Sequence, residues 1–323
     1  FRLELEEGKC EERSVMNEIF AKAKGDASQM EDTWIANQRY WAVFDGATAK
    51  AAFRFPDGRT PGQVAAQTLA EATATLPAEI EATAAIGRLT AALRKALDGH
   101  RGEASGVIYN IHRREIWMVG DCQCAFLLQD GTLECHHPEK AIDHLLSHWR
   151  SDIIRSYLSR GLMTIDEIRN NDPGRKIIQP FISRQVMYQN LNPDLNLLRA
   201  NSSRDTSEAS LSNHNRNLES KNARTENRLA FGVFDGTPIP ECFIEIYPVP
   251  QDATAVILAS DGYPQLYPTL KETEEHLLQL LAEDPLCIGP LCGTKGIRPG
   301  NEAHDDRTYL RCGTSSPACI ANP

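Results

Sequence analysis

Acidic residues that directly follow strand-like apolar runs are the feature that most constrains this chain of 323 residues. A carboxylate at the tip of a strand lies at the edge of a sheet, and a following glycine lets the backbone turn sharply. A fold that gathers several such tips brings carboxylate oxygens together, and these are the ligands that Mg²⁺ and Mn²⁺ prefer over zinc-type ligands. Four short stretches are candidates: Met30-Glu31-Asp32, Val43-Phe44-Asp45-Gly46, Ser260-Asp261-Gly262 and His304-Asp305-Asp306-Arg307-Thr308.

Composition narrows the possible partners and the location. The formal net charge is -10, with 34 basic against 44 acidic residues, which argues against nucleic acid or an anionic membrane as a partner. No apolar run approaches the length of about 18 residues that a membrane span needs, and the opening residues do not read as a signal peptide. Nine cysteines, an odd number, favour reduced thiols over a disulfide framework. We therefore expect a cytoplasmic protein, although the chain lacks an initial methionine and residues upstream could be missing.

Apolar periodicity predicts a strand, two helices, a group of strands, further helices and strands again. The expected strands are 39–44, 106–111, 115–119, 125–128, 132–135, 229–234, 243–249, 253–259 and 308–312. The expected helices are 61–76, which Pro61 can open, 79–97, a helical region over 140–168 and 271–282. Antiparallel strands with paired helices predict one α+β domain over residues 1–323, in which helices cover packed sheets. Residues 190–227 are rich in Asn, Ser, Arg and Glu, and we expect them to form a flexible insertion.

Taken in order, these motifs resemble the metal-dependent protein serine/threonine phosphatases of the PP2C (PPM) type. The series covers most of the chain, and its order is more specific than any single piece. The matching pieces are Met30-Glu31-Asp32, Val43-Phe44-Asp45-Gly46, a helix pair, Met118-Val119-Gly120-Asp121-Cys122, Ala259-Ser260-Asp261-Gly262 and Asp305-Asp306-Arg307-Thr308.

The resemblance implies a fold, an activity and a set of ligands. The fold would be a four-layer αββα sandwich of two antiparallel sheets flanked by helices. The activity would be hydrolysis of phosphoserine and phosphothreonine in a phosphoprotein substrate, by a water activated at a binuclear Mg²⁺ or Mn²⁺ site, with two or three ions in all. The family's roles fall on Asp45 as the bridging ligand, the Gly46 carbonyl, Asp261 and Asp305 on the other ion, Asp121 on a third ion, and Glu31 and Asp32 through water.

This sequence departs from the family pattern at two places. Many relatives have a histidine after the first Asp-Gly, as a general acid, whereas Ala47 stands here. The phosphate-binding arginine upstream of Met-Glu-Asp is replaced by Ala27. Lys50 or Arg54 is expected to bind the substrate phosphate instead. Two alternatives follow: a weakly active or inactive scaffold that binds a phosphoprotein or another partner, and a phosphatase of small phosphorylated metabolites.

Each acidic residue also has a simpler interpretation. Asp-Gly pairs are most often turns, and Asp121 is as well explained by a turn as by a metal ion. Val233-Phe234-Asp235-Gly236 repeats the tetrapeptide at Asp45, but the stretch that follows contains two prolines and cannot start a helix, so Asp235 is assigned to a hairpin or loop. Cysteine and histidine at 122–124 and 135–137 could bind zinc across a hairpin, but the usual two-residue gap between the cysteines is absent. Oligomeric state is left open.

Overall fold

Two antiparallel sheets of five strands each form the centre of the molecule. The computed structural model describes residues 17–47, 53–191 and 229–314. The first sheet has the order β1 (Glu18–Lys22), β10 (Arg307–Gly313), β9 (Ala253–Ala259), β6 (Gln123–Leu128) and β7 (Leu133–His136). The second has the order β2 (Thr33–Ala36), β3 (Tyr40–Ala47), β4 (Glu103–Asn110), β5 (Glu115–Val119) and β8 (Glu245–Pro248). Every pairing within both sheets is antiparallel.

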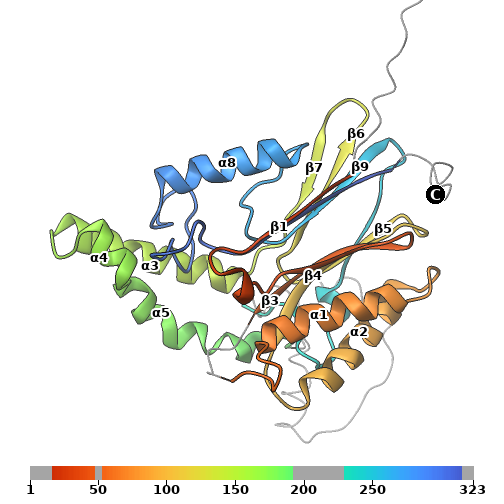
Figure 1. Ribbon diagram of the computed structural model, residues 1–323, viewed down its shortest axis with the longest axis horizontal. Coiled ribbons are helices and arrows are strands. Elements are labelled where there is room, and N and C mark those ends of the chain that lie inside the picture. Colours follow the sequence, from red (N-terminus) through yellow and green to blue (C-terminus); the bar gives the residue numbers. More distant parts are fainter. Residues whose placement is uncertain (1–16, 48–52, 192–228, 315–323) are drawn as a thin grey trace, which may run out of the picture.

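Helices cover the outer faces of the two sheets, so the molecule has four layers (Figure 1). The helices are α1 (Pro61–Thr75), α2 (Ala82–Leu97), α3 (Ala141–Ser159), α4 (Ile165–Asn170), α5 (Pro173–Ile182) and α8 (Leu270–Glu283). Short 3-10 turns lie at Ala27–Gln29, Gln185–Tyr188 and Glu241–Phe243. Figure 1 shows α1 and α2 on the second sheet, α8 on the first, and α3, α4 and α5 to one side of both. The predicted αββα sandwich is confirmed.

Three buried clusters hold the layers together. Phe44 and Trp117 of the second sheet pack with Leu69 and Leu89 of the covering helices. The space between the sheets is filled from both sides and includes Val43, Met118, Phe126, Val256, Leu258 and Leu310. The outer face of the first sheet packs on α8 through Ile257, Leu277 and Tyr309. Burial of this apolar surface is the main force that stabilises such layers.

The pleat of β3 places the first acidic tip between the sheets. Side chains alternate along a strand, so Trp41 and Val43 face the inter-sheet core while Phe44 faces the helices. Asp45 therefore shares the inter-sheet side with Val43. The next helix, α1, begins with Pro61, and Thr60 and Gln63 form a reciprocal capping box at its start.

Some sequence predictions differ from the structure. The expected strand 229–234 is wrong, because its described residues make only isolated bridges, Phe231 with Gln189 and Phe234 with Ala104. The turn at Asp235 bends the chain directly after the second bridge, so no ladder can extend. The helical region 140–168 is divided between α3 and α4, and α5 was not expected. Strands β1 and β2 were also not expected.

The flexible insertion and the single domain are not tested by the structure. Nearly all of the predicted insertion 190–227 falls outside the described residues, so it and the single domain remain predictions. Among the described residues, none of the helices is both long enough and apolar enough to cross a bilayer.

Candidate metal centre

Three carboxylates from three strand ends meet at one edge of the sandwich. Strands β3 and β5 both pair antiparallel with β4, so they run in the same direction and end at the same edge. Asp45 lies at the end of β3, Asp121 follows β5 and Asp261 follows β9. One ligand oxygen from each of these residues lies within 4.8 Å of the others. The structure thus brings together three of the residues predicted from the sequence.

The negative charges in this group are only partly offset by nearby cations, and this raises the pKa values of two of its carboxylates. Burial, followed by the charges of Asp32, Asp305 and Asp121, raises the pKa of Asp45 well above its ordinary value. Burial and the charges of Asp45, Asp121 and Asp305 raise the pKa of Asp261 in the same way. Like charges that are held close together favour the neutral form unless a cation offsets them.

Asp121 differs from the other two because Lys140 lies against it. The Lys140 Nζ is 2.9 Å from Asp121 Oδ2, and the Ser105 hydroxyl donates to Asp121 Oδ1 at 2.5 Å. Burial alone would raise the pKa of Asp121, but the charge of Lys140 and these hydrogen bonds outweigh it, so the pKa is lowered. One of the three carboxylates is therefore held ionised by the protein itself.

Asp32 lies close enough to Asp45 for its charge to raise the pKa of Asp45, and it joins the two sheets. Its Oδ2 accepts hydrogen bonds from the Ser260 hydroxyl at 2.7 Å and from the Thr308 hydroxyl at 2.9 Å. Burial raises the pKa of Asp32 to about 7, helped by the charges of Asp306 and Asp305 and opposed by these two hydrogen bonds. Its Oδ1 is buried and has no hydrogen-bond partner among the described residues.

Asp305 is not a member of the three-carboxylate group, because two lysines engage it. The Lys24 Nζ is 3.0 Å from Asp305 Oδ1, and the Lys295 Nζ is 2.5 Å from Asp305 Oδ2. Despite burial, these two cations lower the pKa of Asp305. The neighbouring Asp306 accepts hydrogen bonds from the Lys24 ammonium and from the backbone N–H of Glu31, so it links the segments after β1 and before β2.

The other predicted residues have different surroundings. The Glu31 Oε1 accepts a hydrogen bond from the Thr60 hydroxyl at 2.5 Å, which ties Glu31 to the start of α1. The Gly46 N–H donates to the Glu31 carbonyl at 3.3 Å, so Gly46 lies beside it. Arg54 is exposed, and its guanidinium donates to the Gln29 side chain at 2.6 Å. Lys50 lies outside the described residues.

The donor set fits a hard divalent cation in part. Two carboxylates with raised pKa values lie beside a third ionised one, and the Asp32 Oδ1 is a buried oxygen without a hydrogen-bond partner among the described residues. Oxygen donors of this kind suit Mg²⁺ or Mn²⁺. Asp305 lies outside this group, and an ammonium group pairs with each of its oxygens.

The structure also bears on two other interpretations of the sequence, the turn at Asp235 and a zinc site at the cysteines. Asp235 is confirmed as a turn residue, since its Oδ1 accepts from the Thr237 N–H at 2.7 Å and from the Thr237 hydroxyl at 2.6 Å. For zinc, Cys122 and Cys124 are buried in the inter-sheet core while Cys135 is exposed. Within the described part of the chain, these cysteines belong to no group of three potential metal ligands.

The sequence did not predict that three lysines, Lys24, Lys140 and Lys295, pair with the carboxylates. Lys24 could have been found from the pairing of β1 with β10, because the register that places Lys22 opposite Arg307 continues to place Lys24 opposite Asp305. That pairing was missed because β1 itself was not expected. Lys140 and Lys295 have no local signal, since each lies in a connection and meets a partner distant in the sequence or in another element.

Comparisons with known proteins give structural matches alone. No protein-family model matches the sequence, and no curated protein is similar to it. The phosphatase PstP of Mycobacterium tuberculosis matches with 14% identity and a TM-score of 0.41, over 92% of this chain and 97% of that one. The phosphatase Stp1 of Staphylococcus aureus matches with 11% identity and a TM-score of 0.44, over 93% and 94%.

Two further structures belong to the same class of enzyme. One is the catalytic domain of PstP in complex with two manganese ions, at 14% identity and a TM-score of 0.41, over 92% of this chain and 97% of that one. The other is the PPM phosphatase MsPP of Mycobacterium smegmatis, at 12% identity and a TM-score of 0.37, over 92% and 98%. The proteins in these matches are serine/threonine phosphatases, the class that the motifs of this sequence resemble.

Proposed function

We propose that this chain is a phosphatase that hydrolyses phosphoserine and phosphothreonine monoesters with the help of Mg²⁺ or Mn²⁺. The observation that supports it most strongly is the convergence of Asp45, Asp121 and Asp261 within 4.8 Å. Such a group needs added positive charge to stay ionised, and so does the attack of an anionic nucleophile on an anionic phosphate. One bound set of cations would meet both needs.

The residues that would hold the cations are those nearest this group. Asp45, Asp121, Asp261 and the Gly46 carbonyl are the proposed direct ligands. Glu31 and Asp32 are proposed to act through water. Bound divalent cations would neutralise phosphate oxygens and lower the pKa of water, so that a nucleophile exists at neutral pH.

Asp305 has a conditional place in this proposal. Its two oxygens pair with Lys24 and Lys295, whose positive charges oppose a cation at Asp305. The proposal of two or three ions includes Asp305 as a ligand, whereas a single ion between Asp45, Asp121 and Asp261 does not need it.

The protein's own side chains keep these groups in position. Asp32 joins the turn after β9 to the start of β10 through Ser260 and Thr308. The Gln123 amide donates to the Ser260 carbonyl at 3.2 Å, which fixes the turn that carries Asp261. For the substrate phosphate we propose Lys50 and Arg54, of which Arg54 would have to exchange its hydrogen bond with Gln29. A phosphoprotein substrate and a cytoplasmic location, without nucleic acid or membrane as partners, complete the proposal.

The test is hydrolysis of a phosphothreonine peptide by the purified chain with and without Mn²⁺. Asp45→Asn is expected to reduce the activity by more than about 100-fold, since even residues that only support metal ligands contribute up to that factor. Asp235→Asn is the matched control, because the same tetrapeptide surrounds it but its carboxylate belongs to a turn. A folded wild-type chain without Mn²⁺-stimulated hydrolysis would contradict the proposal. Parallel assays with sugar and nucleotide phosphates test the alternative of a metabolite phosphatase.

A non-catalytic scaffold that binds a phosphoprotein is the second candidate. Two observations favour it: the lysines that pair with Asp305, and Ala47 in place of the histidine of many relatives. This candidate predicts that the wild-type chain binds a phosphopeptide in calorimetry without releasing phosphate. Tight binding of two Mn²⁺ ions in the same instrument would count against it.

A further inference from the structure

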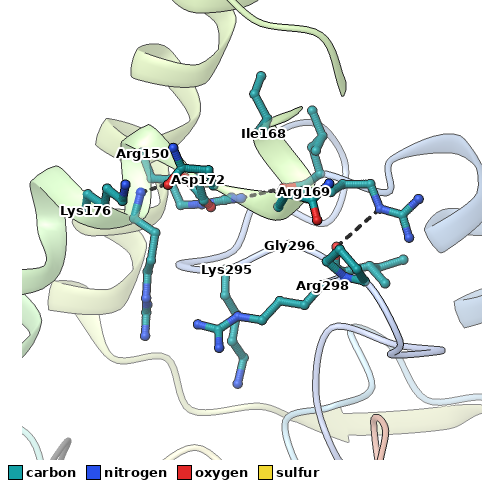
Figure 2. Close-up of a pocket in the computed structure, with 14 residues that line it drawn as sticks. Arg150, Ile168, Arg169, Asp172, Lys176, Lys295, Gly296 and Arg298 are labelled. Atoms are coloured by element: carbon teal, nitrogen blue, oxygen red, sulfur yellow. Dashed lines mark hydrogen bonds and ion pairs between the residues drawn. The ribbon is translucent and has the colours of Figure 1, made fainter. Parts of the chain in front are cut away.

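A second concentration of charge surrounds a cavity of about 450 Å³ that is separate from the three-carboxylate group. Residues of α4, α5 and the segment 295–299 line most of it, and Arg150 of α3 also contributes. Figure 2 shows Lys176, Arg150 and Asp172 on the side of the helices, and Lys295 and Arg298 extending from the facing segment. Small-molecule sites commonly have volumes of about 300–1,000 Å³, so the cavity is large enough for such a ligand.

The charge of the lining is opposite to that of the whole chain. Six basic residues and one acidic residue give the lining a formal charge of 6 − 1 = +5, whereas the chain carries -10. The basic residues are Arg150, Arg169, Arg175, Lys176, Lys295 and Arg298. Positive charge gathered in a concave site of an acidic protein attracts and concentrates anions.

Internal ion pairs account for two of these cations, Lys295 with Asp305 outside the lining and Arg150 with Asp172 within it. The Arg150 guanidinium is buried, lies 2.8 Å from Asp172 and donates to the carbonyls of Leu286, Cys287 and Gly293 at 2.8–3.0 Å. Arg150 thus joins α3 to the segment after α8 and is a structural residue. Because Asp172 is committed to Arg150, the lining contains no carboxylate for the other five cations.

The four cations besides Arg150 and Lys295 have few polar partners. Arg175 donates from one terminal nitrogen to the Thr294 carbonyl at 2.8 Å, but its Nε is buried without a partner among the described residues. Burial, followed by the charges of Arg298 and Arg150, lowers the pKa of Arg175. Lys176 and Arg298 are exposed and make no ion pair with any described residue. The cations therefore repel one another, and an anion between them would relieve that repulsion.

We propose that this cavity binds a small anion that carries more than one phosphate group. The cations stand on two facing walls, α4 and α5 on one and the segment 295–298 on the other, so one compact anion can contact both (Figure 2). Guanidinium groups suit phosphate because their planar donors bind two oxygens at once. None of the direct ligands proposed for the first ion lines the cavity, so anion binding there does not require phosphatase activity.

Lys295 connects this cavity to the candidate metal centre. It lines the cavity, and its Nζ pairs with Asp305 Oδ2 at 2.5 Å. An anion in the cavity competes with Asp305 for the same ammonium group. Binding there is therefore expected to loosen Asp305 as well as to relieve the repulsion between the arginines.

Isothermal titration calorimetry with inorganic pyrophosphate, in EDTA so that no divalent cation is free, tests the proposal. The wild-type chain is expected to bind at one site, and the double variant K176E/R298E is expected to bind at least about tenfold more weakly, since each tenfold corresponds to about 1.4 kcal/mol. Both substituted side chains are exposed, so the fold should persist. R88E/K95E, two exposed positions on α2, introduces the same change in charge far from the cavity and is expected to bind as wild type.

Two further arms separate the possible outcomes. Asp45→Asn is expected to bind pyrophosphate normally, so failure of the phosphatase proposal would leave this one intact. Equal binding by wild type and K176E/R298E would overturn the proposed cavity. Binding of a phosphoserine peptide at this site, with none of pyrophosphate, would overturn the assignment to a small anion and indicate a phosphoprotein contact instead.

Discussion

Lys140 supplies positive charge to the candidate metal centre from within the protein. Its ammonium pairs with Asp121 at 2.9 Å, and its charge opposes the rise in the pKa of both Asp45 and Asp261. Burial alone would lower the pKa of Lys140, but the carboxylates around it, Asp121 first, raise it instead. A cation at this position stabilises the metal-free protein and repels any further cation.

Lys140→Met should therefore have opposite effects on stability and on metal binding. Removal of the ammonium leaves Asp121 without its ion pair, and breaking a buried pair in this way typically costs about 3–5 kcal/mol of unfolding free energy. Mn²⁺ should bind at least about tenfold more tightly, because a nearby positive charge has been lost. Urea denaturation and calorimetry measure the two effects, with the exposed Lys95→Met as the control. Weaker Mn²⁺ binding would instead show that Lys140 is needed to orient Asp121.

The junction between β3 and α1 depends on two glycines. A Cβ on Gly46 would lie 2.3 Å from the Gly62 carbonyl oxygen, and one on Gly62 would lie 2.6 Å from Glu31 Oε1. The close approach holds the end of β3, and with it Asp45, against the first turn of α1. The sharp turn that the sequence predicted directly after Asp45 is wrong, because Gly46 and Ala47 continue β3 and pair with Ala104 and Glu103. Gly46 is needed instead for the close approach to Gly62.

Gly62→Ala should destabilise the chain by about 1–3 kcal/mol, as added atoms do in tightly packed sites. Gly87→Ala is a matched control in α2, because a Cβ there would meet no atom within 4 Å, and it should stabilise the chain by about 0.4–1 kcal/mol. Denaturant midpoints of both variants give the comparison. Equal midpoints for the two would mean that the approach of β3 to α1 is not tight.

His136 joins the edges of the two sheets. It lies at the end of β7 and stacks on Tyr247 of β8, with ring centroids 4.0 Å apart. Burial lowers the pKa of His136, although the charges of Glu134 and Glu245 oppose the shift. Because the folded pKa lies below the unfolded one, the unfolded chain takes up the proton first as the pH falls. This residue therefore contributes stability above the ordinary histidine pKa of about 6.5 that is lost below it.

His136→Phe keeps an aromatic ring against Tyr247 and removes the titration. The unfolding free energy of the variant should fall less steeply than that of wild type between about pH 6.5 and 5. Urea denaturation at several pH values measures the slope. His137→Phe makes the same substitution at the neighbouring exposed position and serves as the control. Identical slopes for wild type and His136→Phe would contradict the role given to this contact.

At the scale of the whole molecule, the sequence predicted the layers better than it predicted the site. Strong apolar periodicity placed β5 and β9 at their observed bounds, whereas β1 was missed because it is short and carries polar residues among its five positions. Asp45, Asp121 and Asp261 could be predicted because each follows an apolar strand. The state of Asp305 could not, because Lys24 lies 281 positions away along the chain.

The central claim is that the carboxylates at the strand ends of both sheets form one site for divalent cations. Crystals grown with Mn²⁺, measured with X-rays at the manganese absorption edge, test it most directly. The account predicts an anomalous peak between Asp45, Asp121 and Asp261, with carboxylate oxygens at about 2.0–2.6 Å. If a second ion binds, Asp305 is expected among its ligands, with Lys24 or Lys295 displaced by the added positive charge. The absence of any anomalous peak at Asp45 in well-ordered crystals would contradict the account.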